Sequence, residues 1–363
     1  MALRRCPPAT PACSTCNRSL TLDAPRIAGG ILTTNPTTGL PQLATASYTI
    51  TAADKPANPA VYYPVSLINS SGATPALPAA LLGNSLTIVG GQTTIDTTVV
   101  LPGGAFSVTA NGNIGVGTHG VIDVSGQAVQ FVDVVATIGG GDITLSTATG
   151  TIAIQSGAIL NVGDLADVGA LNRTSAGTLT LSAPVGGVTI AAATQSSPGA
   201  LLEGQGPTAD SGGSFVLDTN TLAPGTPQTY DALAATLNAG GFTAWNIRAR
   251  TGDIAMTGLT QARNVTVSAD TGNIDISGTI DASGRTPGAI SIWAGHNLTL
   301  ESSAVLNASA ATANANGNGV RCCSKPMRRI AARGRSSSMS ARRSMSAPRR
   351  RTPASLDQSL AEP

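Results

Sequence analysis

The chain has 363 residues, of which only 11% are charged and 3% aromatic, and 42 are glycine. A globular enzyme of this size usually builds its core from Leu, Phe, Tyr and Trp and its surface from Lys and Glu, so the composition argues against that class. Residues 1–320 hold 10 basic and 17 acidic side chains, a net charge of −7 that would repel nucleic acid. Residues 321–363 hold 11 basic and 2 acidic side chains and account for the basic character of the chain.

The amino-terminal part of the sequence lacks regular patterning. Residues 1–21 are rich in Pro, Cys and Arg, and we expect them to be disordered, with an out-of-frame leader as one explanation. The first five residues have the positive charge of a signal peptide, but Cys6-Pro7-Pro8 follow where an apolar run should stand, so no signal peptide is recognisable. The sequence contains no run of about 18 apolar residues, so we expect no insertion into a membrane. In residues 22–84 prolines are frequent and the alternation is irregular, which predicts short strands joined by long loops.

All five cysteines lie near the two ends of the sequence, at positions 6, 13, 16, 322 and 323. Cys13 and Cys16 have the spacing of half a zinc site or of a redox dithiol. No second pair stands at zinc-finger spacing, so we expect no metal site there. The body without thiols suits a protein that crosses an oxidising periplasm unfolded, because no disulfide can form on the way.

From residue 85 to residue 319 a Gly or Asn repeatedly precedes alternating apolar and small polar residues. The copies are GDITL at 141–145, GTLTL at 177–181 and GSFVL at 213–217, spaced 36 residues apart, with softer echoes NVTV at 264–267 and AISI at 289–292. Alternation with period two indicates strands with one buried face, and recurrence at an interval of this size indicates a stacked repeat. The pattern predicts an all-β solenoid of stacked coils.

In such a solenoid the aliphatic side chains at every second position turn inward and pile into columns. Ile143, Leu179 and Phe215 should therefore stack on one another, while Thr, Ser, Asn and Asp form the outer surface. At roughly 25 to 36 residues per coil, about 300 residues would build on the order of 8 to 12 coils, about 4.8 Å apart. End coils without caps would expose strand edges and favour end-to-end self-association.

Four polar residues, Asp123, Asn161, Asp281 and Asn307, follow apolar pairs in a second recurring motif. Asp and Asn tolerate left-handed backbone and bond to their own backbone two residues on, so we interpret these positions as coil corners. The alternative is a row of calcium ligands. It is disfavoured because the glycine-aspartate nonapeptide of β-roll proteins is absent and the carboxylates are sparse.

Residues 230–241 depart from the strand period. Ala and Leu dominate, Leu233 and Leu237 stand four apart, and Gly240-Gly241 close the segment, so the pattern predicts a short helix. This segment falls within the longest interval between repeat copies. We expect a helical excursion from the stack that covers an apolar flank of the coil.

Residues 320–363 consist largely of Arg, Ser, Ala and Met without alternation or helical period, and we expect them to be disordered. One interpretation is a genuine polybasic tail that attracts anionic lipid or nucleic acid. The interpretation we favour is a frameshifted carboxyl end, because the repeat pattern stops at residues 316–319.

The sequence shows no familiar catalytic motif. A Gly-x-Ser-x-Gly elbow, a P-loop and a dinucleotide fingerprint are all missing. The two histidines, His119 and His296, stand at expected turns without a metal-ligand partner at i+4, so we interpret them as solvated turn residues. We predict no catalytic, cofactor-binding or metal-binding residue.

Two pairs of aspartates are the exception that merits testing. Asp164 with Asp167, and Asp270 with Asp275, could each lie close together on a coil. Paired carboxylates would suit a β-helix enzyme that cleaves polysaccharide.

Such an enzyme also needs basic or aromatic side chains to hold the sugar. Trp245, Arg248 and Arg250 form the sole local cluster of that type, and strand alternation places the two arginines on one face. The simpler explanation is a surface salt bridge between these arginines and Asp253.

Several runs resemble the filamentous haemagglutinin family of large bacterial exoproteins, which are secreted by the two-partner route. They are GDITL at 141–145, LNAGGF at 237–242, RARTGDI at 248–254 and IDASG at 280–284. The resemblance covers about residues 22–319 and is one of repeat style. It implies a right-handed parallel β-helix, displayed on or released from Gram-negative cells, where many members act as adhesins.

The function implied by the resemblance is that of a structural rod segment in a secreted or outer-membrane-associated adhesin, with no enzyme activity. The implied partners are a host glycan or surface protein and, during secretion, an outer-membrane transporter. Since secretion signals are not recognisable and the repeats stop early, we interpret the chain as an interior fragment of a larger protein. Two alternatives remain, a polysaccharide-acting β-helix enzyme and a truncated, non-functional remnant of an exoprotein gene.

Overall fold

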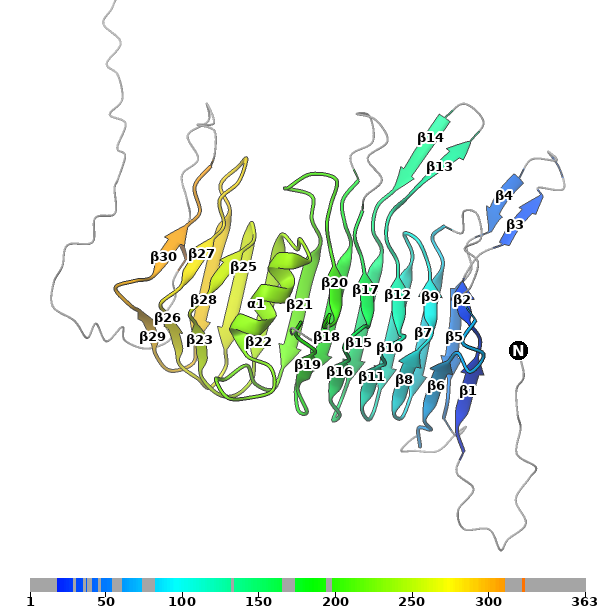
Figure 1. The fold of residues 1–363 in the computed structure, drawn as a ribbon, viewed down its shortest axis with the longest axis horizontal. Coiled ribbons are helices and arrows are strands. Elements are labelled where there is room, and N and C mark those ends of the chain that lie inside the picture. The colour runs from blue at the N-terminus through cyan, green and yellow to red at the C-terminus, as the bar shows by residue number, and fades with distance from the viewer. Residues whose placement is uncertain are drawn as a thin grey trace, which may run out of the picture. The chain divides into compact units, whose positions relative to one another are not determined.

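Parallel strands from successive turns of the chain stack in register, as the alternating pattern predicts. The computed structural model describes residues 18–28, 31–34, 37, 41–44, 47–53, 61–73, 82–131, 134–164, 174–193, 198–310 and 322–323. All of them belong to one unit, residues 1–331. Among the described residues the fold is a parallel β-helix with one helix, so the predicted fold class is confirmed (Figure 1).

Three sheets begin in the earlier coils, and the first of them also continues through the later coils. Sheet 1 has ten strands: β5 (Ser47–Thr51), β7 (Ser85–Gly90), β10 (Ala105–Ala110), β15 (Asp142–Thr147), β18 (Thr178–Ala183), β21 (Ser214–Thr219), β22 (Ala244–Ala249), β25 (Asn264–Ala269), β28 (Ala289–Ala294) and β31 (Cys322–Cys323). Sheet 2 contains β1 (Leu20–Asp23), β6 (Val65–Ile68), β8 (Thr93–Asp96), β11 (Ile114–Val116), β16 (Ile152–Ile154) and β19 (Val188–Ile190). Sheet 3 contains β2 (Arg26–Ala28), β9 (Thr98–Val100), β12 (Val121–Asp123), β17 (Ile159–Asn161) and β20 (Leu201–Glu203).

Beyond the helix, two shorter sheets take over from sheets 2 and 3. Sheet 4 contains β23 (Ile254–Met256), β26 (Ile274–Ile276) and β29 (Leu298–Leu300), and sheet 5 contains β24 (Leu259–Gln261), β27 (Thr279–Asp281) and β30 (Val305–Asn307). Two antiparallel hairpins, β3 (Ile31–Thr34) with β4 (Pro41–Ala44) and β13 (Gln127–Phe131) with β14 (Val134–Ile138), project from the coils (Figure 1). Sheet 1 alone continues from one part of the stack to the other.

The basic coil is shorter than the sequence pattern suggests. Ala105 pairs with Ser85, 20 residues earlier, and Asn264 pairs with Ala244, also 20 residues earlier. The 36-residue spacing of the three clear copies is a true coil interval, because Asp142 pairs with Thr178. Coils of that length carry additional loops, so the expected range of 25 to 36 residues describes only the coils with insertions.

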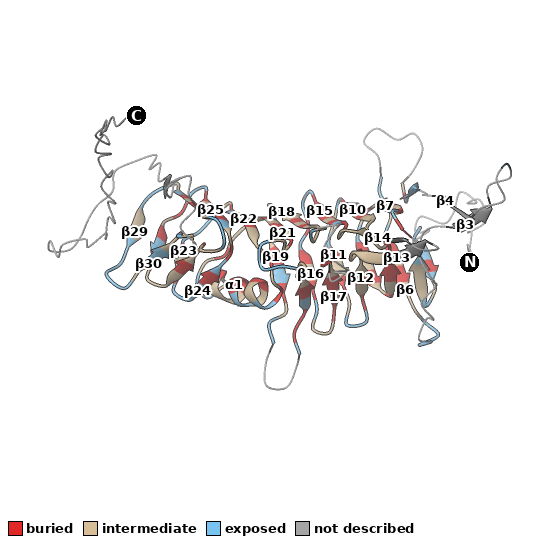
Figure 2. Cartoon of the chain, turned by 90° about the horizontal axis from the view of Figure 1, so that it is seen from above, coloured by how far each residue is buried: buried red, intermediate tan, exposed pale blue. Residues whose placement is uncertain are grey.

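Inward side chains form continuous columns across sheet 1. One column runs through Leu86, Phe106, Ile143, Leu179, Phe215, Trp245, Val265 and Ile290, each the register partner of the next and each buried. Figure 2 shows buried residues recurring in strand after strand. Burial of one aliphatic side chain of this size stabilises the folded state by roughly 1.5–3 kcal/mol. The predicted stacking of Ile143, Leu179 and Phe215 is confirmed.

The helix, α1 (Tyr230–Ala239), is part of the stack and not an excursion from it. Thr229 caps its start by accepting a hydrogen bond from the backbone N–H of Ala232. The helix contacts β20 on one side and β24 on the other, so it occupies the place of a sheet 3 strand within one coil. Sheets 2 and 3 end at this coil because the chain there forms a loop and a helix. The expected helix is therefore present and buries Leu233 and Leu237 in the core, but the expectation of an excursion from the stack is wrong.

The longest interval between repeat copies also contains the strand β22, in addition to the expected helix. Residues 244–249 pair with β21 on one side and β25 on the other, so the interval contains an additional coil. The side chain of Trp245 fills the inward position between Phe215 and Val265.

Side chains cap the edge of sheet 2 where its last strand meets the helical coil. The hydroxyl of Thr219 accepts a hydrogen bond from the N–H of Val188 at 3.0 Å, and Oε1 of Gln228 accepts one from the N–H of Ile190 at 2.7 Å. Thr219 and Gln228 are both buried. These bonds replace the strand that the helical coil does not supply.

The disorder expected for residues 1–21 and 320–363 falls mostly outside the described residues, but the described parts include the start of β1 at Leu20 and the strand β31 at Cys322–Cys323. The Cys13–Cys16 pair and the carboxyl-terminal segment from residue 324 onward also lie outside the described residues. Within the expected irregular region, β1, β2, β5 and β6 already belong to sheets 1 to 3. The coil stack therefore begins before residue 85.

Replacing Leu179 by Ala should lower the free energy of unfolding by about 2–5 kcal/mol, because the methyl groups removed come from a closed column. Urea unfolding followed by circular dichroism measures this change. The matched control is Thr180→Ala on the outer face, for which we expect about 0.5 kcal/mol or less. Equal losses for both variants would contradict the inward columns.

Replacing Gln228 by Leu should lower the free energy of unfolding by about 1–3 kcal/mol, because the buried N–H of Ile190 loses its acceptor. Hydrogen exchange at the Ile190 amide should accelerate in the same variant. Gln92→Leu, at an exposed position, serves as the control. Unchanged exchange at Ile190 would refute the capping role of Gln228.

Candidate functional site

The first candidate place is an arginine-aspartate network on the outer face of sheet 1. Arg248 donates three hydrogen bonds to the Asp270 carboxylate at 2.8 to 3.1 Å, two from Nε and one from Nη2. Arg250 donates two to the Asp218 carboxylate, from Nε at 2.7 Å and from Nη2 at 2.6 Å. Hydrogen bonding to Asp218 raises the pKa of Arg250 above its already high value. Both guanidinium groups are thus occupied by carboxylates.

The prediction that these arginines form a salt bridge with Asp253 is wrong. Asp253 instead accepts hydrogen bonds from the backbone N–H and the side-chain amide of Asn273. Asp218 and Asp270 lie on the neighbouring rungs of sheet 1, one coil before and one coil after the arginines. Stacking brings them together although they are distant in sequence.

The proposed sugar-holding cluster is not assembled. Trp245 is 1% exposed, because alternation turns it inward while Arg248 faces outward. Trp293 is 39% exposed and pairs in register with Ser268, which pairs with Arg248 on the coil before, but that arginine is already bound to Asp270. An aromatic platform beside free arginines, as a polysaccharide-cleaving site requires, is therefore not formed by these residues.

The predicted carboxylate pairs are not brought into one cluster either. Asp270 follows β25 and binds Arg248, whereas Asp275 lies within β26 of sheet 4. Asp164 is fully buried, and Asp167 lies outside the described residues. Within the part of the chain that the structure describes, no three His, Cys, Asp or Glu side chains are grouped to hold a metal ion.

The four corner residues behave as their sequence context predicts. Each side chain accepts a hydrogen bond from the backbone N–H two residues on, with distances from 2.8 to 3.2 Å at Asp123, Asn161, Asp281 and Asn307. In addition the amide of Asn307 donates to Asp281 on the preceding coil at 3.1 Å. These bonds stabilise turns and leave no ring of oxygens converging on one point.

The histidines lie at turns, as expected. His119 has an 81% exposed side chain whose Nδ1 lies 3.5 Å from Asp96. The backbone N–H of His296 donates to the carbonyl of Gly272 at 3.1 Å. Both positions stabilise corners between coils.

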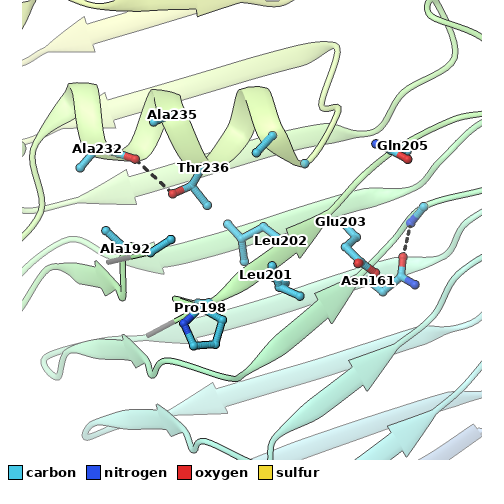
Figure 3. Close-up of a pocket in the computed structure, with 15 residues that line it drawn as sticks. Asn161, Ala192, Pro198, Leu201, Leu202, Glu203, Gln205, Ala232, Ala235 and Thr236 are labelled. Carbon is cyan, nitrogen blue, oxygen red and sulfur yellow. Dashed lines mark hydrogen bonds between the residues drawn. The ribbon is translucent and has the colours of Figure 1, made fainter. Parts of the chain in front are cut away.

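The second place is a cavity between β20 and α1, which no sequence motif indicates. Its volume is about 390 Å³. Alanines dominate the wall, together with Pro198, Leu201 and Leu202, and the polar residues Asn161, Glu203, Gln205 and Thr236 complete it. Figure 3 shows α1 on one side, Leu201 and Leu202 opposite it, and Glu203 beside Asn161 at one end. The cavity exists because a helix stands where other coils have a strand.

Glu203 is the only acidic residue among those that line the cavity. It pairs in register with Asn161, which pairs with Asp123 on the coil before. Burial raises the pKa of Glu203, and the negative charge of Asp123 raises it further. No described side chain donates a hydrogen bond or a positive charge to this carboxylate.

One edge of β20, the last strand of sheet 3, pairs with β17, and its other edge faces the helix α1. The N–H of Leu201 donates to Ala158, and the carbonyl of Glu203 accepts from Val162, so these groups point toward β17. By alternation, the backbone groups of Leu202 point toward α1. The cavity therefore lies at an interrupted edge of sheet 3.

No helix among the described residues has the length and apolar character needed to cross a bilayer. Comparison with protein-family models, with curated proteins and with solved structures finds no match. The function is therefore argued from the fold and from the residues themselves.

Replacing Glu203 by Gln should raise the melting temperature at pH 7. A carboxyl whose pKa is raised on folding binds more protons in the folded state, so its contribution to stability falls as pH rises through the raised value. The gain from Gln should disappear below the ordinary Glu pKa of about 4.3. Glu301→Gln, at an exposed position, is the control. A Glu203→Gln variant that is less stable at pH 7 would contradict the unpaired, partly buried carboxylate.

Proposed function

We propose that these coils are a structural segment of a secreted or cell-surface bacterial adhesin that attaches to a host glycan or surface protein. The observation that supports this proposal most directly is the outer face of sheet 1. One outward row, in register from coil to coil, is Thr87, Ser107, Thr144, Thr180, Val216, Asn246, Thr266 and Ser291. Except at Val216, the row consists of small hydroxyl and amide groups, which offer donors and acceptors that match the hydroxyl groups of a glycan.

A flat polar face suits weak, repeated contacts better than a single deep site. Each coil adds another set of the same groups about 4.8 Å further on, so an extended ligand meets equivalent positions along the face. Several such contacts made at once raise the overall affinity without any strong single contact. The proposed binding surface is therefore the outward row of sheet 1 and not the arginine-aspartate network.

The arginine-aspartate network gives little support to the enzyme alternative. A polysaccharide-cleaving site needs free basic groups and a pair of carboxylates at about 5–10 Å across the scissile bond. Here Arg248 and Arg250 already bind Asp270 and Asp218, and these aspartates are held in ion pairs. Attachment without chemistry agrees better with this arrangement.

Export belongs to the same proposal. The resemblance of residues 141–145, 248–254 and 280–284 to the filamentous haemagglutinin family favours secretion through an outer-membrane transporter partner. The scarcity of cysteine in the coils is compatible with that route, since a chain without thiols crosses an oxidising compartment free of disulfides.

The test is a binding measurement with the full 363-residue chain on a glycan array and on cultured epithelial cells. We expect saturable binding that weakens by about tenfold in the variant Thr144→Glu/Thr180→Glu, which places charge in the outward row. Thr189→Glu, on the outer face of sheet 2, is the matched control and should bind normally. Circular dichroism serves to check that each variant is folded.

Two results would oppose the proposal. The first is binding no greater than that of an unrelated acidic protein on every glycan and cell type tested. The second is release of sugar from a polysaccharide panel, which would support the enzyme alternative instead.

A further inference from the structure

We propose that the cavity between β20 and α1 binds a small alkylammonium ion, with the ammonium group against Glu203 and the hydrocarbon chain along the alanine, leucine and proline wall. This inference goes beyond the attachment function and does not rest on it. The cavity and the outward row of sheet 1 are different surfaces, so each can be tested without the other.

The size and lining of the cavity suit a small organic ligand. Its volume of about 390 Å³ falls at the lower end of the range of roughly 300–1,000 Å³ that is usual for ligand sites. Leu201 is 44% exposed, and Pro198, Ala192, Ala193 and Ala235 are exposed as well. Apolar groups that line a hollow and remain exposed to water gain free energy when a hydrocarbon covers them.

The charge of the site selects the sign of the ligand. Glu203 is the sole charged residue among the lining residues, and none of them is Lys, Arg or His. Asp123 adds a second negative charge along the same row of sheet 3. The positive charge of a bound cation offsets both the desolvation and the repulsion that raise the pKa of Glu203. An anion would be repelled, and a neutral ligand would leave the carboxylate unpaired.

The chemistry of the wall favours a primary ammonium over a quaternary one. Quaternary ammonium ions are usually held by aromatic faces, and no aromatic residue lines this cavity. A primary ammonium has three N–H donors, which match a carboxylate and neighbouring side-chain oxygens. The side chains of Asn161 and Gln205 also line the cavity, and their oxygens can accept hydrogen bonds from the remaining N–H groups (Figure 3).

The arrangement of the ends sets the orientation. Glu203 and Asn161 lie side by side at one end of the cavity, while Ala192 and Pro198 lie toward the other (Figure 3). The hydrocarbon chain therefore runs along Leu201 and Leu202 and passes beneath Thr236 of α1. A chain of four to six carbons, roughly 5–8 Å long at about 1.3 Å per bond, fits a cavity of this volume.

The experiment uses isothermal titration calorimetry with the full chain at pH 7. Three probes of equal chain length are compared: n-hexylammonium chloride, n-hexanol and sodium hexanoate. We expect n-hexylammonium to bind about tenfold or more tightly than n-hexanol, since a charge-assisted hydrogen bond contributes at least one factor of ten. Hexanoate should show no binding. Equal affinities for n-hexylammonium and n-hexanol would overturn the proposal.

Variants locate the binding in this cavity. Glu203→Gln keeps the shape and removes the charge, and should weaken n-hexylammonium binding by about tenfold with little effect on n-hexanol. Thr236→Leu extends a larger side chain toward Leu202 and should weaken both probes. Glu301→Gln, an exposed carboxylate far along the chain, should leave both affinities unchanged. Melting temperatures serve to check that each variant is folded.

The pH dependence supplies a second readout. Affinity for n-hexylammonium should fall as the pH drops through the raised pKa of Glu203, because the protonated carboxyl no longer attracts the cation. Affinity for n-hexanol should stay level over the same range. An ammonium affinity that is unchanged in Glu203→Gln, or equally reduced in Glu301→Gln, would refute the assignment of the site to Glu203.

Discussion

The register between successive coils is the constraint on which the rest of the structure depends. In sheet 1 each residue pairs with its equivalent on the next coil, so one inward position becomes a column and one outward position becomes a row. A slip of one residue would turn every aliphatic side chain outward, because side chains alternate with period two. Burial of the columns therefore fixes the register. The register in turn determines which polar residues form the outer rows and which ion pairs form between coils.

The helical coil shows how much irregularity this arrangement tolerates. Sheet 1 passes through it unbroken, while sheets 2 and 3 end and sheets 4 and 5 begin. The loss of strand partners is offset locally: Thr219 and Gln228 accept hydrogen bonds from the edge of β19, and α1 buries Leu233 and Leu237 against the stack. A helix follows the edge of a strand less closely than another strand would. The cavity beside β20, with Glu203 at one end, is a consequence of that poorer fit.

The sequence predicts whatever depends on local pattern. Alternation identifies the strands, and the Asp and Asn corners follow from their known tendency to bond two residues on, as at Asp123. Contacts that arise only when coils stack on one another cannot be predicted from local sequence patterns. The partners of Arg250 could not be inferred, because Asp218 is 32 residues away and is adjacent only through the length of the intervening coil. The coil that contains β22 did not match the repeat copies, because Trp245 stands where they have Leu, Ile, Val or Phe. The cavity depends on which element faces β20, and no local motif specifies that.

The most direct test of the account is disulfide cross-linking across coils, in a chain whose native cysteines are replaced by Ser. Thr144 and Thr180 are register partners on the outer face of β15 and β18. At about 4.8 Å, their Cα separation is within the range that a disulfide spans. Thr144→Cys/Thr180→Cys should therefore cross-link rapidly on mild oxidation and migrate as a looped chain in non-reducing electrophoresis. Thr144→Cys/Ser182→Cys is offset by two residues, at about 8 Å, and should remain reduced. Cross-linking of the offset pair in preference to the aligned pair would contradict the stacked, in-register coils.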